Sequence, residues 1–310
     1  MNGSSLKPLN LGCAYSVRFS PDGTRLAVLG HDLILWDVAA RQKLWRGKPV
    51  PHCSAMAFSP DGGRLAVKST TGLMAVVDAA SGDVIVNFRN KKDGEGSGPA
   101  WSPCGQYLAD GGWNGRLQVR LAATGEVVFA HEHRGEMLRG VSAIDGGQRL
   151  LVLHGVKSVE EGQAQPPDYV TVWDWPLQAG AGRTVLSLAG LSSIAASTDG
   201  RYLAALHRVD GVEQLSVFAL ADGRQLASTP AGQGGGTGNT LCWSPDGDTV
   251  GRIGKGKLEF YGWPGLALRQ ELAFIYPCAL AFLPGTQMAA IGSWEKGALV
   301  ELALNAAAVP

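Results

Sequence analysis

The stretch VRFSPDGTRLAV (Val17–Val28) returns almost unchanged as MAFSPDGGRLAV (Met56–Val67), 39 residues further along the chain. Each copy contains an apolar segment, a Ser-Pro-Asp-Gly turn and a second apolar segment. Proline suits the second position of a type I turn, and glycine supplies the left-handed backbone of a tight hairpin. The stretch therefore predicts two antiparallel strands joined by a short turn.

Five weaker copies of the same pattern follow, which makes seven in all. They are AWSPCGQYLAD from Ala100, SAIDGGQRLLV from Ser142, ASTDGRYLAAL from Ala196, CWSPDGDTVGR from Cys242 and AFLPGTQMAAI from Ala281. Successive turns are separated by 39, 43, 41, 54, 47 and 39 residues. A period of about 40–45 residues is typical of the four-stranded blade of a β-propeller.

The sequence between the turns supplies the remaining strands of each blade. A third apolar segment follows the first two, as in LILWD (Leu33–Asp37) and YVTVWD (Tyr169–Asp174), and a fourth reads VIVNF (Val84–Phe88). We label the four strands of a blade A to D in chain order. Because no helical pattern of useful length competes, the sequence predicts an all-β seven-bladed propeller of four-stranded antiparallel blades, forming a single domain over residues 1–310.

The last repeat lacks its D strand. Its A, B and C strands are expected at Cys278–Leu283, Gln287–Gly292 and Ala298–Leu304, and only NAAAVP remains after them. Residues 5–11 precede the first A strand and belong to no blade. We therefore expect this N-terminal segment to supply the missing outer strand of the last blade, which would cover otherwise exposed strand edges.

The composition and charge of the chain argue against several classes of function. Lys+Arg and Asp+Glu both number 27, so no general attraction to nucleic acid or to an acidic membrane is expected. The N-terminus has no apolar signal-peptide region, and no run of about 18 apolar residues occurs. The five cysteines are scattered, which favours reduced thiols. We expect a cytoplasmic monomer without a cofactor.

The repeats resemble those of the WD40-repeat family of seven-bladed β-propellers. The resemblance rests on the Phe/Trp-Ser-Pro-Asp-Gly motifs at Phe19–Gly23, Phe58–Gly62 and Trp243–Gly247, and on Trp-Asp at Trp36-Asp37 and Trp173-Asp174. It implies a propeller that binds other proteins. The repeats are degenerate: Trp-Asp closes strand C in two blades, and Gly-His occurs once, at Gly30-His31. The family's Asp-His-Ser-Trp hydrogen-bond network is therefore expected to be absent from most blades.

The loops of a propeller divide between its two ends. The A–B and C–D turns are short here, whereas the D–A and B–C loops are long and chemically varied and hold, or adjoin, all six histidines. Loops on a rigid scaffold are where binding residues concentrate, so the D–A and B–C loops are predicted to form the binding face. The candidate partner-binding residues are His31, Asp32, Trp113, Asn114, His133, Arg134, Arg139, His154, His207, Trp294 and Lys296.

No complete catalytic constellation is visible, so the favoured hypothesis is a non-catalytic scaffold that presents this face to a protein or peptide partner. Two alternatives stay open: a metal-dependent, lactonase-like hydrolase using Asp32, His133, His154 or Asp210, and a small-ligand binder with Trp113 and Trp294 as stacking walls. His131 and His133 would share one face of a strand, with His154 as a third ligand. A solvated strand end is the favoured interpretation, so neither a metal nor a catalytic residue is predicted.

Several other segments receive structural predictions. The tryptophans Trp36, Trp101, Trp173 and Trp243 occupy repeat positions on strands and are predicted to pack blade against blade. Val156–Asp168 is predicted to be an exposed arm, Gly232–Gly238 a flexible crossing, and the basic run Arg89–Lys92 a solvated loop.

Overall fold

The structure is a computed structural model that describes residues 8–89, 96–156, 166–232 and 240–304. The chain groups into two compact units, which are described separately. Unit 1 comprises Met1–Leu44, Ser192–Leu220 and Arg224–Pro310, and unit 2 comprises Trp45–Leu191 and Ala221–Gly223. The single domain over residues 1–310 stays a prediction.

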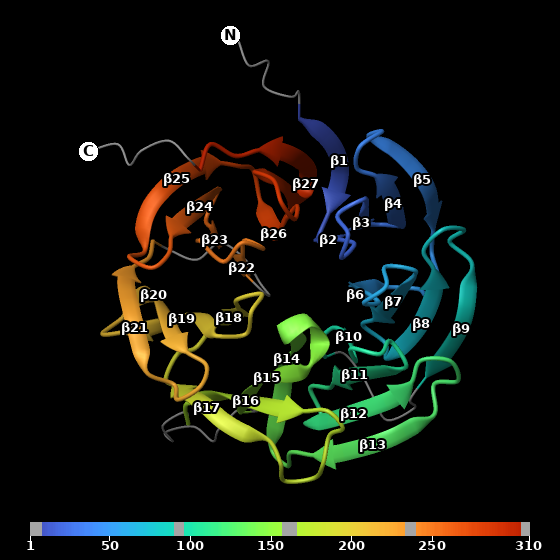
Figure 1. The fold of residues 1–310 in the computed structure, drawn as a ribbon, viewed down its shortest axis with the longest axis horizontal. Helices are drawn as coiled ribbons and strands as arrows, with labels where there is room; N and C mark the ends of the chain where they lie inside the picture. The colour runs from blue at the N-terminus through green and yellow to red at the C-terminus, as the bar shows by residue number, and fades with distance from the viewer. Residues whose placement is uncertain (1–7, 90–95, 157–165, 233–239, 305–310) are drawn as a thin grey trace. The chain divides into compact units, whose positions relative to one another are not determined.

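The strands form seven antiparallel blades, six of four separate strands and one in which the long β27 (Met288–Glu301) serves as two, so the chain is an all-β seven-bladed propeller, as predicted (Figure 1). Within a blade, strands that follow one another along the chain are hydrogen-bonded neighbours. The described residues contain one short 3-10 helix, η1 (Asp145–Gly147), and no helix long and apolar enough to cross a membrane.

Unit 1 contains blades 1, 5, 6 and 7, and its boundary with unit 2 falls within β5. Blade 1 consists of β2 (Ser16–Phe19), β3 (Arg25–Leu29), β4 (Leu33–Asp37) and β5 (Gln42–Gly47). Blade 5 consists of β18 (Ser193–Ala196), β19 (Tyr202–Val209), β20 (Val212–Ala219) and β21 (Gln225–Pro230). Blade 6 consists of β22 (Leu241–Trp243), β23 (Thr249–Gly254), β24 (Lys257–Gly262) and β25 (Ala267–Ala273). Blade 7 consists of β26 (Pro277–Phe282), β27 (Met288–Glu301) and β1 (Leu9–Ala14).

Unit 2 contains blades 2, 3 and 4. Blade 2 consists of β6 (Cys53–Phe58), β7 (Arg64–Ser69), β8 (Leu73–Asp78) and β9 (Val84–Arg89). Blade 3 consists of β10 (Ala100–Trp101), β11 (Tyr107–Gly111), β12 (Arg116–Leu121) and β13 (Val127–Glu132). Blade 4 consists of β14 (Glu136–Ile144), β15 (Arg149–Val156), β16 (Asp168–Asp174) and β17 (Arg183–Leu188).

Blade 7 is completed by the N-terminal strand, which confirms the predicted closure. β1 pairs antiparallel with β27, with Leu9 opposite Leu299. β27 covers both the B and the C strand of this blade: its first half pairs with β26, and the N–H of Leu302 donates to the carbonyl of Gln287 at 2.8 Å. The closing strand lies three residues further along the chain than predicted, ending at Ala14, and residues 5–7 lie outside the described residues.

The Ser-Pro-Asp-Gly turns are held by their own side chains. In blade 1, Ser20 Oγ accepts the N–H of Arg25 at 2.9 Å and donates to Asp22 Oδ1 at 2.5 Å. Gly23 takes a φ of +72°, a conformation that glycine adopts without steric cost. The same pair of serine contacts recurs at Ser59, Ser197 and Ser244. The repeated motif is therefore a structural turn that fixes the A–B hairpin.

The repeat tryptophans pack in the core, as predicted. Trp36, Trp101, Trp173 and Trp243 are all buried. The indole N–H of Trp101 in blade 3 donates to Ala57 O of blade 2 at 3.0 Å, and that of Trp243 in blade 6 donates to Ala195 O of blade 5 at 2.9 Å. Each of these two indoles thus joins two neighbouring blades of one unit and buries a large apolar surface.

The structure corrects the predicted B–C loops. His154 and His207 were expected in B–C loops, as was Lys68 at the start of the segment KSTTG, but each lies near the end of a B strand and is buried. The strands run further than expected because these polar side chains find partners inside the fold and so tolerate burial. Three other predicted segments lie largely outside the described residues. These are residues 157–165 of the predicted arm, 233–238 of the glycine-rich crossing and 90–92 of the basic run.

Candidate functional site

A tight turn between blades 3 and 4 brings two polar side chains together. The turn runs from His133 to Glu136, and the N–H of Glu136 donates to the carbonyl of His133 at 3.2 Å. Gly135 takes a φ of +80°, which the third position of a type II turn requires. His133 Nδ1 consequently lies 3.7 Å from Glu136 Oε2.

His154 joins this pair from the neighbouring strand β15. Its backbone pairs with Leu138 of β14, and its Nδ1 lies 3.0 Å from Glu136 Oε2. His131, at the end of β13, stands edge-on to His133 with ring centroids 4.6 Å apart, and His133 stands edge-on to His154 at 4.6 Å. Three imidazoles and one carboxylate therefore gather in unit 2.

A hydrogen-bond chain runs from this cluster into the core of blade 4. Trp173 Nε1 donates to Thr171 Oγ1 at 2.9 Å, and Thr171 Oγ1 lies 2.8 Å from His154 Nε2. The Tyr169 hydroxyl donates to Glu136 at 2.8 Å, and its ring stacks on His154. With a proton on Nδ1, His154 donates to Glu136 and accepts from Thr171, so every member of the chain is satisfied. Glu136, His154, Thr171 and Trp173 thus form one continuous chain of hydrogen bonds.

Burial controls the protonation of the histidines. It lowers the pKa of His154 to about 4, with a further contribution from His133, and Glu136 offsets only part of this. Burial also lowers the pKa of His133, as does His131, again against the opposing effect of Glu136. Both imidazoles are therefore neutral at pH 7, and a neutral imidazole can offer a nitrogen lone pair to a ligand.

His133 is not part of this hydrogen-bond chain. Its side chain is 12% exposed, and its Nε2 is buried without a hydrogen-bond partner among the described residues. Its Nδ1, at 3.7 Å from Glu136, lies beyond hydrogen-bonding distance. A nearly buried imidazole without a hydrogen bond is uncommon, because buried polar atoms usually have partners.

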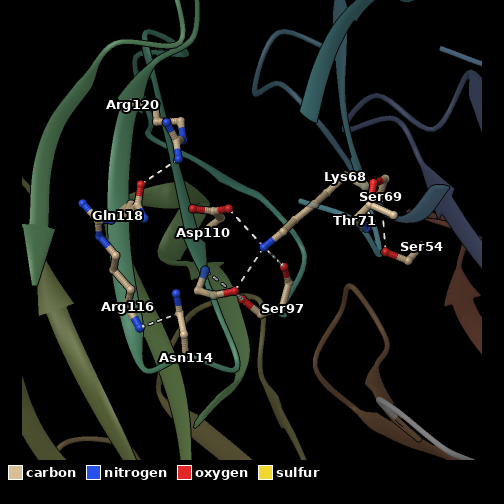
Figure 2. A network of polar contacts seen from close by, with 11 residues as sticks. Ser54, Lys68, Ser69, Thr71, Ser97, Asp110, Asn114, Arg116, Gln118 and Arg120 are labelled. Carbon is tan, nitrogen blue, oxygen red and sulfur yellow. Dashed lines mark hydrogen bonds and ion pairs between the residues drawn. The ribbon is translucent and has the colours of Figure 1, made fainter. Parts of the chain in front are cut away.

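A buried lysine links blades 2 and 3 (Figure 2). Lys68 Nζ lies 3.0 Å from Asp110 Oδ2 and donates to Ser97 O at 3.2 Å and to Gly111 O at 3.1 Å. The three ammonium protons thus have three oxygen acceptors. The side chains of Lys68 and Asp110 are only 2% and 7% exposed, so this network stabilises the fold and does not offer a binding surface.

A buried arginine plays the corresponding role in unit 1. The guanidinium of Arg252, on β23, contacts the carboxylates of Glu213 and Glu259 and the carbonyl of Gly232. Burial raises the pKa of Glu259, but hydrogen bonds from Lys257 and Arg252 outweigh burial and hold this pKa below its ordinary value of 4.5. The network joins blade 5 to blade 6.

Exposed apolar side chains gather on the loops of blade 7. We call Tyr15, Ile275, Tyr276 and Trp294 the blade-7 patch. The rings of Tyr15 and Trp294 stack with centroids 5.6 Å apart, and the N–H of Trp294 donates to Tyr276 O at 3.3 Å. Ile275, Tyr276 and Trp294 are each more than half exposed. Tyr276 also has a φ of +46°, which is uncommon for a bulky residue and costs about 1–3 kcal/mol.

The other predicted site residues are distributed over both units. Trp294 and the exposed Lys296 lie within β27, between the parts that serve as the B and C strands of blade 7, and His31 and Asp32 lie in the B–C turn of blade 1. Trp113 and Asn114 lie in the B–C turn of blade 3, where Trp113 is 46% exposed.

The remaining candidates lie in blades 3, 4 and 5. Arg134 is exposed in the turn beside His133. Arg139 is paired with Asp168 at 2.8 Å and donates to Leu191 O, so its guanidinium has a structural role in unit 2. His207 bonds Ser216 inside blade 5.

Sequence reasoning brought His133 and His154 together as candidates but missed Glu136, Tyr169 and Thr171. A signal for Glu136 was available in His133-Arg134-Gly135-Glu136, because glycine at the third position of a four-residue turn brings the first and fourth residues close. Tyr169 and Thr171 gave no signal, since alternating polar residues on a strand are ordinary.

Comparison with solved structures supports the class of β-propellers defined by these blades. Hydrazine synthase from Kuenenia stuttgartiensis is similar over 98% of this chain and 99% of its own, with a TM-score of 0.76 and 15% identity. At this identity the likeness shows the fold alone. No protein-family model matches the sequence, and the search of curated proteins finds no match.

Proposed function

We propose that the chain is a non-catalytic, WD40-like interaction scaffold whose D–A and B–C loops bind a protein or peptide partner. The observation that carries the proposal is the blade-7 patch, in which Ile275, Tyr276 and Trp294 are exposed side by side. Tyrosine and tryptophan dominate the energetics of protein interfaces because they combine a large apolar surface with few rotatable bonds.

The surroundings of the patch support the same function. Glu295 and Lys296 are exposed at its edge, which gives an apolar centre with a polar rim, the usual anatomy of an interface. The strained backbone of Tyr276 persists only where the surrounding structure imposes it, and such strain gathers at functional sites. The patch is uncharged, so the expected partner is a segment that presents apolar side chains.

Substitution of Trp294 tests the scaffold. Affinity capture with the intact chain, followed by mass spectrometry, identifies the bound protein, and titration then compares its affinity for each variant. We expect Trp294→Ala to weaken binding by about 30-fold, since loss of a tryptophan anchor costs about 2 kcal/mol or more. Ile85→Ala is the matched control, because Ile85 is equally exposed but lies on the outer strand β9. Equal affinity of Trp294→Ala and the unaltered chain would contradict the proposal.

A second candidate function, a metal-dependent hydrolase, is favoured by the meeting of His133, Glu136 and His154. Two histidines and one glutamate are the protein ligands of some catalytic zinc sites. If this function holds, the zinc-loaded chain hydrolyses simple esters or lactones, and His133→Ala abolishes the turnover. If the chain binds one zinc ion but hydrolyses no ester or lactone, the hydrolase function is excluded. The scaffold function then stands, and the zinc ion has a structural role.

A further inference from the structure

We propose that His133, Glu136 and His154 bind one zinc ion. The ligand atoms that these residues offer lie within 4.8 Å of one another. They come from a tight turn and the adjacent strand β15, so the backbone brings them together before any ion arrives.

The observed separations fit the size of the ion. Zinc binds imidazole nitrogen and carboxylate oxygen at about 2.0–2.2 Å, so two ligand atoms in a tetrahedral site lie roughly 3.3 Å apart. Glu136 Oε2 lies 3.0 Å from His154 Nδ1 and 3.7 Å from His133 Nδ1, on either side of that value. All three ligand atoms lie within 4.8 Å of one another, so side-chain rotations are enough to form the three bonds.

The surrounding groups match what a metal site needs. Histidine ligands usually bond an outer partner through the second ring nitrogen, which fixes ring orientation. Thr171 lies 2.8 Å from His154 Nε2 and supplies this partner once the His154 proton moves to Nε2. Tyr169 holds Glu136 by a hydrogen bond of 2.8 Å.

Among the described residues, His133 is the one of the three proposed ligands that makes no hydrogen bond through its side chain. Without the ion, this imidazole makes no hydrogen bond within the described part of the chain, although it is nearly buried. Coordination gives its Nδ1 a strong partner and leaves only the Nε2 N–H without one, whereas Glu136 and His154 already satisfy each other. Two nitrogen ligands and one oxygen ligand suit zinc, while magnesium and calcium prefer oxygen alone.

Zinc titration of the metal-stripped full-length chain tests the site. We expect one zinc ion per chain by calorimetry, and a cobalt-loaded form whose visible spectrum reports nitrogen and oxygen ligands. Changing a group that only orients a ligand costs 10–100-fold in affinity, so removing a ligand should cost about 100-fold or more. His133→Ala and Glu136→Gln should both show this loss, and magnesium should not bind.

The variants are chosen so that the fold survives. Glu136→Gln keeps the shape of the side chain and an oxygen that accepts from Tyr169, and His154 is left unchanged because its side chain is fully buried. His31→Ala, at an exposed histidine in blade 1, is the control and should keep full affinity. Zinc should raise the melting temperature of the unaltered chain and of this control only.

The site is overturned if the unaltered chain binds no zinc more tightly than His133→Ala does, or if Glu136→Gln keeps the affinity of the unaltered chain. The inference is independent of the scaffold function, since Trp294 lies in unit 1 and the zinc ligands lie in unit 2. Failure of the zinc titration therefore leaves the partner-binding experiment untouched.

Discussion

Arg252→Met is expected to lower the free energy of unfolding by about 3–5 kcal/mol, because it leaves buried carboxylates without their counter-charge. The Arg252 side chain is 0% exposed, and its guanidinium contacts both Glu213 and Glu259. Methionine fills a similar volume but supplies no charge and no donor. Lys257, 2.9 Å from Glu259, compensates only one of the two carboxylates. Urea unfolding at pH 7 measures the loss.

Arg201→Met is the matched control in the same unit. Arg201 also pairs with a carboxylate, Asp199, but its side chain is 71% exposed. Ion pairs in solvent contribute little, because water and salt screen them and long side chains lose entropy in forming them. The control should therefore lose far less stability than Arg252→Met. Equal losses in the two variants would mean that burial does not set the importance of the Arg252 network.

The pH dependence gives an independent check on the Arg252 network. The network holds the pKa of Glu259 below 4.5, so its contribution to stability is present above pH 4.5 and is lost as the pH falls through the lowered value. In Arg252→Met this pKa rises, because the hydrogen bond and the charge of Arg252 no longer lower it. The gap in stability between the unaltered chain and the variant should therefore narrow as the pH drops below 4.5. A constant gap down to pH 3 would contradict this account.

The fold could be predicted from the sequence because the information is local and repeated. Ser20, Asp22 and Gly23 form a turn whose hydrogen bonds lie within six residues, so the motif works wherever it appears. Seven copies then set the number of blades. The closure by β1 was also predictable, because blade 7 lacked one strand and the N-terminal segment was the unassigned segment that could supply it.

The candidate site was harder to predict because its side chains meet across different strands and turns. Lys68 and His154 look like loop residues in the sequence, since charged and polar residues are mostly exposed. Their partners Asp110, Ser97 and Glu136 come from other segments of the chain, and the sequence near Lys68 or His154 does not show which segments will pair with it. The blade-7 patch could be predicted only in part: Trp294 was selected as a candidate, whereas Ile275 is a single apolar residue in a D–A loop and gave no signal of its own.

Substitution of Lys68, the buried lysine of unit 2, is expected to cause a second large loss of stability (Figure 2). Lys68→Met leaves Asp110 buried without its counter-charge and removes the ammonium hydrogen bonds to the carbonyls of Ser97 and Gly111. We expect a loss of about 3–5 kcal/mol in the free energy of unfolding. Asp110→Asn should cost a comparable amount, because the buried ammonium group then loses its counter-charge. Lys296→Met, at an exposed lysine, should leave stability unchanged.

The double variant separates the ion pair from the rest of the network. Once Lys68→Met has removed the ammonium group, Asp110→Asn removes a charge that has become unfavourable, so the second change costs less than it does alone. The double variant should therefore be more stable than the sum of the single losses predicts, by about 0.5–3 kcal/mol. Urea unfolding of all four proteins measures this coupling. Additive losses would mean that Lys68 and Asp110 act independently, and that the two carbonyls account for the burial of the lysine.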